Sequence, residues 1–221
     1  MPTASLNRWS GIFLGLGSVL LVVTGIIPFF ISLKINISEV TMQHINLQSA
    51  AFVMYYVLCF VAFSFILIGL PAFYLRQSAQ VGKMGLIGLM LYVFGVLLNI
   101  AVTASFTSVL PMVDEEVPHL IDQIIDSNFF IYPFGSFFLC IIGAILFGIA
   151  VIRATIFPAY VGVLFAIAPI FHTAEMFVTN DTAFAVLDLL AAVSLGVALT
   201  TVGSNLISDR HRIHTGASID N

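Results

Sequence analysis

The amino-acid sequence predicts an all-α, polytopic integral membrane protein, a bundle of six transmembrane helices with both termini in the cytoplasm. Of the 221 residues, 60% are hydrophobic and only 8% are charged, whereas soluble domains carry about 25% charged residues. The apolar residues form six long stretches, each close to the roughly 20 residues that cross a bilayer as a helix. The lysines and arginines lie almost entirely on one side of these stretches.

The six predicted spans follow one another with short polar connections between them. Because lipid offers no partner to backbone N–H and C=O groups, continuous apolar runs of this length must be helices. The spans are expected at about 11–33, 51–75, 84–110, 129–152, 158–178 and 183–207, in one domain over 1–207. The first is too long for a signal peptide and is expected to be retained. Residues 208–221 are polar and are expected to form a disordered cytoplasmic tail.

Two connections, 34–50 and 113–130, are partly amphipathic and are expected to lie in the outer interface. In the second, Pro118 can occupy the first position of a helix. Apolar residues then recur at helical spacing, namely Leu120, Ile121, Ile124 and Ile125. This pattern predicts a short helix with its apolar side toward the lipid.

The distribution of basic residues predicts the orientation. With the N-terminus in the cytoplasm, six of the seven lysines and arginines fall on the cytoplasmic side, and only Lys34 falls outside. The six are Arg8, Arg76, Lys83, Arg153, Arg210 and Arg212. Cytoplasmic loops of membrane proteins carry such an excess, so we expect both termini inside.

Acidic residues gather on the opposite, outer side. They are Glu39, Asp114, Glu115, Glu116, Asp122, Asp126 and Asp181. Acidic residues have little weight in setting topology, so this asymmetry has two interpretations. It is either a solvated rim or a cation-attracting vestibule built from Asp114, Glu115, Glu116 and Asp181.

Small residues predict where helices touch. Glycines occur along the first, third and fourth spans, at Gly11, Gly15, Gly85, Gly88, Gly95, Gly135, Gly143 and Gly148. In lipid, small residues allow close backbone approach, so these faces could also support oligomerisation. Membrane lipids are the expected surroundings. Nucleic acid is excluded as a partner, because the net charge is −4 and no basic patch exists.

One cluster of ionisable residues interrupts the apolar second half of the chain. His172 and Glu175 are three residues apart near the end of the fifth span, so they share a helix face. Asp188 lies at a matching depth in the sixth span, given a rise of about 1.5 Å per residue. Pro169 precedes them and can kink the fifth span. The three ionisable side chains are therefore expected to meet in the outer leaflet.

Three interpretations of this cluster remain open, since charged groups at such depth mark sites or pathways. His172, Glu175 and Asp188 could hold two helices together or sense a ligand, which is the leading hypothesis. They could instead form a proton or cation station of a small carrier. As a third alternative, they could bind zinc or a similar metal and activate water in a metal-dependent intramembrane hydrolase.

Polar residues elsewhere in the spans are few. Asn99 lies near the middle of the third span, where it could make an interhelical hydrogen bond or line a pathway to the vestibule. Cys59 and Cys140 lie in apolar runs and are interpreted as small hydrophobes. No nucleotide loop, nucleophile elbow or haem motif occurs, so no catalytic residue is assigned. The leading hypothesis is a protein that is not an enzyme and has no cofactor, with the enzyme and a zinc or similar metal ion kept as the alternative.

The stretch FGSFFLCIIGAILFGIAVIRATIFPAYVGVLFAIAP, residues 134–169, resembles part of the small six-span bacterial membrane proteins grouped under domains of unknown function. In those proteins a glycine-rich helix ends in arginine, and a short connection leads to a Pro-x-x-x-Gly start of the next helix. Here these positions are Arg153, Pro158 and Gly162. The resemblance covers about a sixth of the chain. It implies a six-span architecture in a bacterial inner membrane, and it assigns no catalytic residue.

Overall fold

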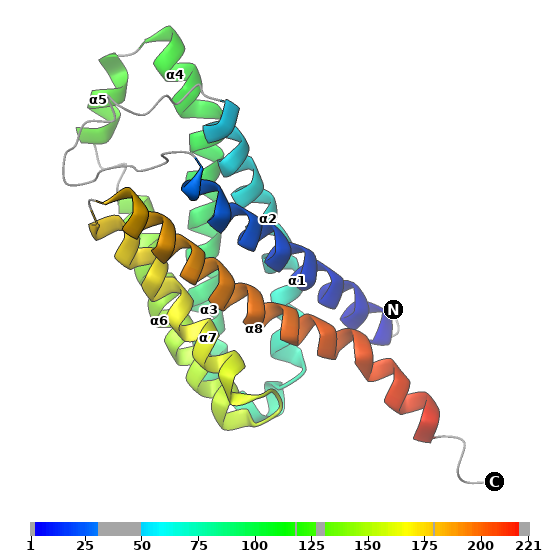
Figure 1. Ribbon diagram of the computed structural model, residues 1–221. Coiled ribbons are helices and arrows are strands. Elements are labelled where there is room, and N and C mark those ends of the chain that lie inside the picture. The colour runs from blue at the N-terminus through cyan, green and yellow to red at the C-terminus, as the bar shows by residue number, and fades with distance from the viewer. Residues whose placement is uncertain (1–2, 31–49, 118, 127–130, 179, 217–221) are drawn as a thin grey trace.

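The computed structural model describes residues 3–30, 50–117, 119–126, 131–178 and 180–216. These residues form helices joined by short turns, and no strand occurs among them. The predicted all-α fold is confirmed. Within the described ranges, six helices form the body of the molecule (Figure 1): α1 (Thr3–Ile26), α2 (Ala50–Leu75), α3 (Ser78–Ala104), α6 (Ile131–Ala154), α7 (Ala159–Ala174) and α8 (Asp181–Gly216).

These six helices form a closed ring in which each contacts two neighbours, in the order α1, α2, α3, α6, α7, α8 and back to α1. Successive helices run in opposite directions, so their connections alternate between the two ends of the bundle (Figure 1). One end, here called the acidic end, carries α4 (Leu110–Glu116) and α5 (His119–Asp126). The other, the basic end, carries Arg8, Arg76, Lys83 and Arg153.

Five of the helical segments are long and apolar enough to cross a membrane, which makes the chain a multi-pass membrane protein. Their mean hydropathy ranges from 2.1 to 2.6, over Ser5–Phe29, Ala50–Leu75, Ser78–Val113, Ile131–Ala154 and Thr182–Ser208. The segment expected to cross at 158–178 is shorter, since α7 has only 16 residues. The 3-10 turn η5 (Glu175–Phe177) extends it, to about 30 Å in all at the usual rise per residue.

The third helical segment continues past its predicted end near 110. A π-helical turn, η3 (Ser105–Val109), joins α3 to α4. Pro111 lacks an N–H and would clash with a carbonyl in the preceding turn of a regular helix. The wider turn accommodates it, and the N–H of Leu110 bonds to the carbonyl of Ser105.

Two further predictions concern the short helix after Pro118 and the C-terminal tail. The short helix expected after Pro118 is present as α5, whereas Pro118 itself and the connection over 31–49, with Lys34, lie outside the described residues. The last helix, α8, continues to Gly216, past the end of the sixth span predicted near 207, and residues 217–221 of the predicted tail lie outside the described residues.

Close backbone packing joins α3 to α6. A Cβ atom at Gly88 would lie 2.5 Å from the backbone nitrogen of Phe147, and one at Gly143 would overlap the backbone of Tyr92. The fully buried Ser136 also donates a hydrogen bond of 2.8 Å from Oγ to the carbonyl of Gly95. The predicted role of these glycines in packing is confirmed. By contrast, a Cβ built at Gly15 would meet no described atom within 4 Å apart from the local backbone of its own helix.

Aromatic side chains fill the ring toward the basic end. This aromatic cluster consists of Phe73, Tyr92, Phe147, Phe157 and Phe165, all 4% exposed or less. Their rings meet at centroid distances of 4.7 to 6.0 Å, mostly edge to face, which is the favoured arrangement of aromatic pairs. The half of the bundle near the basic end is therefore tightly packed.

Candidate functional site

The candidate site lies at the acidic end, where α7 ends and α8 begins. His172 lies in the last turn of α7, and Glu175 follows in η5, so both side chains leave the same face. The side chain of Asn180 caps α8 by accepting a hydrogen bond of 3.0 Å from the N–H of Ala183. This cap fixes the start of α8, and Asp188 lies about two turns further along.

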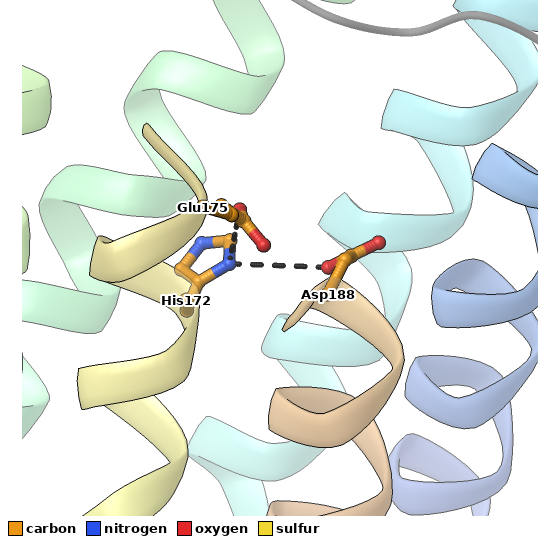
Figure 2. Close-up of side chains that lie close together, drawn as sticks. All are labelled: His172, Glu175 and Asp188. Atoms are coloured by element: carbon orange, nitrogen blue, oxygen red, sulfur yellow. Dashed lines mark ion pairs between the residues drawn. The ribbon is translucent and has the colours of Figure 1, made fainter. Parts of the chain in front are cut away.

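The three side chains predicted to meet do come together (Figure 2). The Nδ1 atom of His172 lies 2.7 Å from Oε1 of Glu175 and 3.9 Å from Oδ1 of Asp188. At the shorter distance the imidazole and the carboxyl group share a proton between Nδ1 and Oε1. One ligand atom from each of the three residues lies within 4.8 Å of the others. The juxtaposition joins α7 to α8 across their interface.

Both carboxyl side chains of the cluster are buried, so holding a negative charge on them costs free energy. Glu175 is 5% exposed and Asp188 is 6% exposed. The Oε2 atom of Glu175 is buried and has no hydrogen-bond partner among the described residues. Two carboxylates beside one histidine carry a net charge of −2 when the imidazole is neutral and −1 when it is protonated. Arg8, Arg76, Lys83 and Arg153 lie at the other end of the helices and cannot balance this charge.

Tyr55 is the fourth polar contributor, and it comes from α2 on the far side of the ring. Its hydroxyl donates a long hydrogen bond of 3.4 Å to Oδ2 of Asp188. Oδ1 of the same carboxylate faces His172. Phe137 packs against the imidazole of His172, edge to face, with the ring centroids 5.2 Å apart. These contacts restrict how Asp188 and His172 can turn.

A cavity of about 60 Å³ lies between the site and the aromatic cluster. A water molecule needs about 10–15 Å³ by this measure of space, so the cavity has room for several waters or a small ligand. His172, Asp188, Tyr55 and Asn99 contribute polar groups to its wall, and the other lining residues are mostly apolar.

Asn99 lies on the wall of this cavity. Its Oδ1 atom is buried and makes no hydrogen bond to a described residue, so this oxygen does not join two helices. The hydroxyl of Thr103 bonds instead to the backbone carbonyls of Asn99 and Ile100 in its own helix. An unpaired buried amide oxygen is costly, which is consistent with a wall that meets water or a ligand.

The remaining predicted residues occupy the acidic end without joining the cluster. Glu115 and Glu116 are exposed in the last turn of α4. Asp114 lies in the same helix and Asp181 is the first residue of α8, but their side chains lie outside the described part of the structure. Pro169 is buried within α7 and lines the cavity, and the helix continues past it to Ala174.

Sequence reasoning missed three residues of the site: Tyr55, Cys59 and Cys140. All three line the cavity. They lie in spans that are apolar on every side, so no periodicity shows which face points inward. The burial of Cys59 and the partial burial of Cys140 fit their interpretation as small hydrophobes.

The arrangement provides one imidazole nitrogen and two carboxylate oxygens at the edge of a cavity. Such a set of donors can exchange a proton, pair with an organic cation or coordinate a metal ion. Comparison with protein-family models, with curated proteins and with solved structures found no match to this chain.

Proposed function

We propose that this chain is a six-span membrane protein that binds a small cationic ligand at His172, Glu175 and Asp188, as a sensor or receptor facing the outer side. The observation that carries the proposal is the buried, unpaired Oε2 atom of Glu175, in a cluster of two carboxyl groups and one imidazole. A buried charge without a partner costs free energy. A bound cation would supply the missing partner.

The aromatic cluster favours binding over passage. Phe73, Phe147 and Phe165 are completely buried and lie in mutual contact between the cavity and the basic end. A ligand that enters the cavity from the acidic end therefore meets packed rings beyond it. This geometry is typical of a site that detects a ligand and releases it to the same side.

The proposed topology depends on the basic residues that gather at one end of the bundle. Arg8, Arg76, Lys83 and Arg153 gather there, which favours that end in the cytoplasm and the candidate site in the outer half. The segment formed by α7 and η5 would make the sixth crossing, because its length of about 30 Å matches the hydrocarbon core. The resemblance of residues 134–169 favours a bacterial inner membrane.

Ligand-induced stabilisation tests the proposal, because a ligand that binds only the folded state raises the unfolding temperature. The purified chain would be melted with zinc, manganese and small organic ammonium ions. At least one cation should stabilise the wild type. Ala191 lines the cavity from α8, so Ala191→Leu should weaken this effect. Val193→Leu is the matched control, since Val193 is 40% exposed on the outside of the same helix. The proposal fails if no cation shifts the melting temperature.

A proton- or cation-coupled carrier is the second candidate, and Asn99 favours it. The unpaired oxygen of Asn99 extends the polar wall of the cavity from the cluster toward the middle of α3. A carrier predicts cation flux into proteoliposomes that Asp188→Asn abolishes. Binding without flux would favour the sensor.

A further inference from the structure

We infer that the cation is a divalent transition metal ion, bound by Nδ1 of His172 and by one carboxylate oxygen each of Glu175 and Asp188. This inference rests on the proposed cation site and specifies its ligand. Three observations carry it: the distances between the donor atoms, the charge of the cluster and the partners of the remaining oxygens.

The donor atoms are already close to the spacing that a metal requires. In a tetrahedral site with bonds of about 2.0–2.1 Å, neighbouring ligand atoms lie about 3.3 Å apart. His172 Nδ1 is 2.7 Å from Oε1 of Glu175 and 3.9 Å from Oδ1 of Asp188. Each of these distances has to change by only about 0.6 Å to reach that spacing. The widest pair, at no more than 4.8 Å, has to close by about 1.5 Å, which side-chain rotation can provide.

The charge of the cluster matches a divalent ion. A metal binds neutral imidazole, so the proton that His172 shares with Glu175 leaves to water on binding. The two carboxylates then contribute −2, which the ion neutralises. A monovalent organic cation would leave one buried negative charge unbalanced. No basic side chain among the described residues near the cluster could make up the difference.

The remaining oxygens are arranged to complete a coordination shell. Oδ2 of Asp188 accepts a hydrogen bond from Tyr55, and hydrogen-bonded carboxylate ligands are typical of metal sites. Oε2 of Glu175 has no partner among the described residues, so it can serve as a second oxygen ligand from the same side chain. The adjoining cavity has room for water at a further position.

The mixed nitrogen and oxygen donors indicate which metals fit. Calcium takes six to eight oxygen ligands, and magnesium keeps an octahedral shell of oxygens. Copper(I) prefers sulfur ligands. One imidazole with two carboxylates suits zinc, manganese or iron(II). Zinc and its spectroscopic substitute cobalt(II) are therefore the probes to use.

The test measures metal bound to the purified full-length chain. After incubation with zinc and removal of the excess, the wild type should retain about one zinc ion per chain. His172→Ala and Glu175→Gln should each retain at least tenfold less at the same free zinc concentration. His119→Ala and Glu116→Gln are matched controls and should bind as the wild type does, because both side chains are exposed at the same end of the bundle.

Cobalt(II) gives an answer that does not depend on how the variants fold. Bound in this site, it should show the intense visible absorption of four-coordinate cobalt, and zinc should displace it. Failure of the wild type to retain zinc or to produce this absorption would overturn the inference. If organic ammonium ions alone then stabilise the chain, the metal inference falls and the proposed cation site stands. If neither class of cation stabilises it, both fall.

Discussion

The hydroxyl of Tyr55 lies 3.4 Å from Oδ2 of Asp188, although the two residues are 133 positions apart. Tyr55 belongs to α2 and Asp188 to α8, two helices that meet only marginally in the ring. The other oxygen of Asp188 faces His172 on α7. The carboxylate of Asp188 on α8 therefore contacts side chains of two other helices. Its Oδ2 faces Tyr55 of α2, and its Oδ1 faces His172 of α7.

Tyr55→Phe should lower metal affinity without unfolding the protein. The change removes only a hydroxyl whose hydrogen bond is longer than the usual 2.7–2.8 Å, so the loss of stability should be about 1 kcal/mol or less. Removing such an outer partner of a metal ligand typically costs about 10- to 100-fold in affinity. Competition with a zinc indicator measures this. Tyr132→Phe, at a side chain that is 59% exposed, should change nothing.

Glu175→Gln and His172→Ala should differ in how much they lower the stability of the metal-free protein. In Glu175→Gln, Asp188 still balances protonated His172, so the free energy of unfolding should change by less than about 1 kcal/mol. His172→Ala leaves two buried carboxylates unopposed and should lose about 3–5 kcal/mol. Unfolding in metal-free buffer measures both variants. An equally large loss in Glu175→Gln would show that the cluster serves mainly to hold α7 and α8 together.

Gly143→Ala should destabilise the bundle, because the added methyl group overlaps the backbone of Tyr92. Overpacking of this kind costs about 1–3 kcal/mol. Gly15→Ala is the matched change in α1, where the new methyl group would meet no described atom of another helix within 4 Å, and it should be neutral or slightly stabilising. Thermal melting of the two variants compares them directly. Equal melting temperatures would contradict the tight α3–α6 contact.

The orientation can be checked with an impermeant thiol reagent on intact cells. Glu116 is exposed at the acidic end and Gln80 is exposed at the basic end. Glu116→Cys should therefore react from outside, and Gln80→Cys should react only after the cells are opened. The wild type is the background, since Cys59 is buried and Cys140 is partly buried. The reverse pattern would place the candidate site on the cytoplasmic side.

Much of the fold could be predicted from the sequence, because a long apolar run in lipid must form a helix to satisfy its own backbone hydrogen bonds. The helix α5 was predicted from the spacing of its isoleucines and leucine, and it forms where expected. Helix ends were harder to predict. The third segment continues through Pro111 because a π-helical turn absorbs the proline, and a local rule that proline ends a helix does not anticipate such a turn.

The part of the site that depends only on how deep each residue lies in the membrane could be predicted from the sequence. Counting residues from the turn between α7 and α8 placed His172, Glu175 and Asp188 at one level, and they do meet. Depth does not determine rotation about the helix axis. For that reason the inward direction of Tyr55 and Cys59 on the uniformly apolar α2 could not be predicted, and neither could the cavity that they line.

The packed aromatic cluster also has an electrical consequence. Asp188 lies about 10 Å along α8 from its start, whereas Phe73, Phe147 and Phe165 fill the ring beyond the cavity. An ion that enters from the acidic end is therefore held at about a third of the depth of a hydrocarbon core of about 30 Å. A charge that crosses the whole field exchanges about 2.3 kcal/mol per 100 mV, so a divalent ion that stops at this depth exchanges about 1.5 kcal/mol. With the acidic end outside, occupancy should be about tenfold higher in cells polarised by about 100 mV than in depolarised cells.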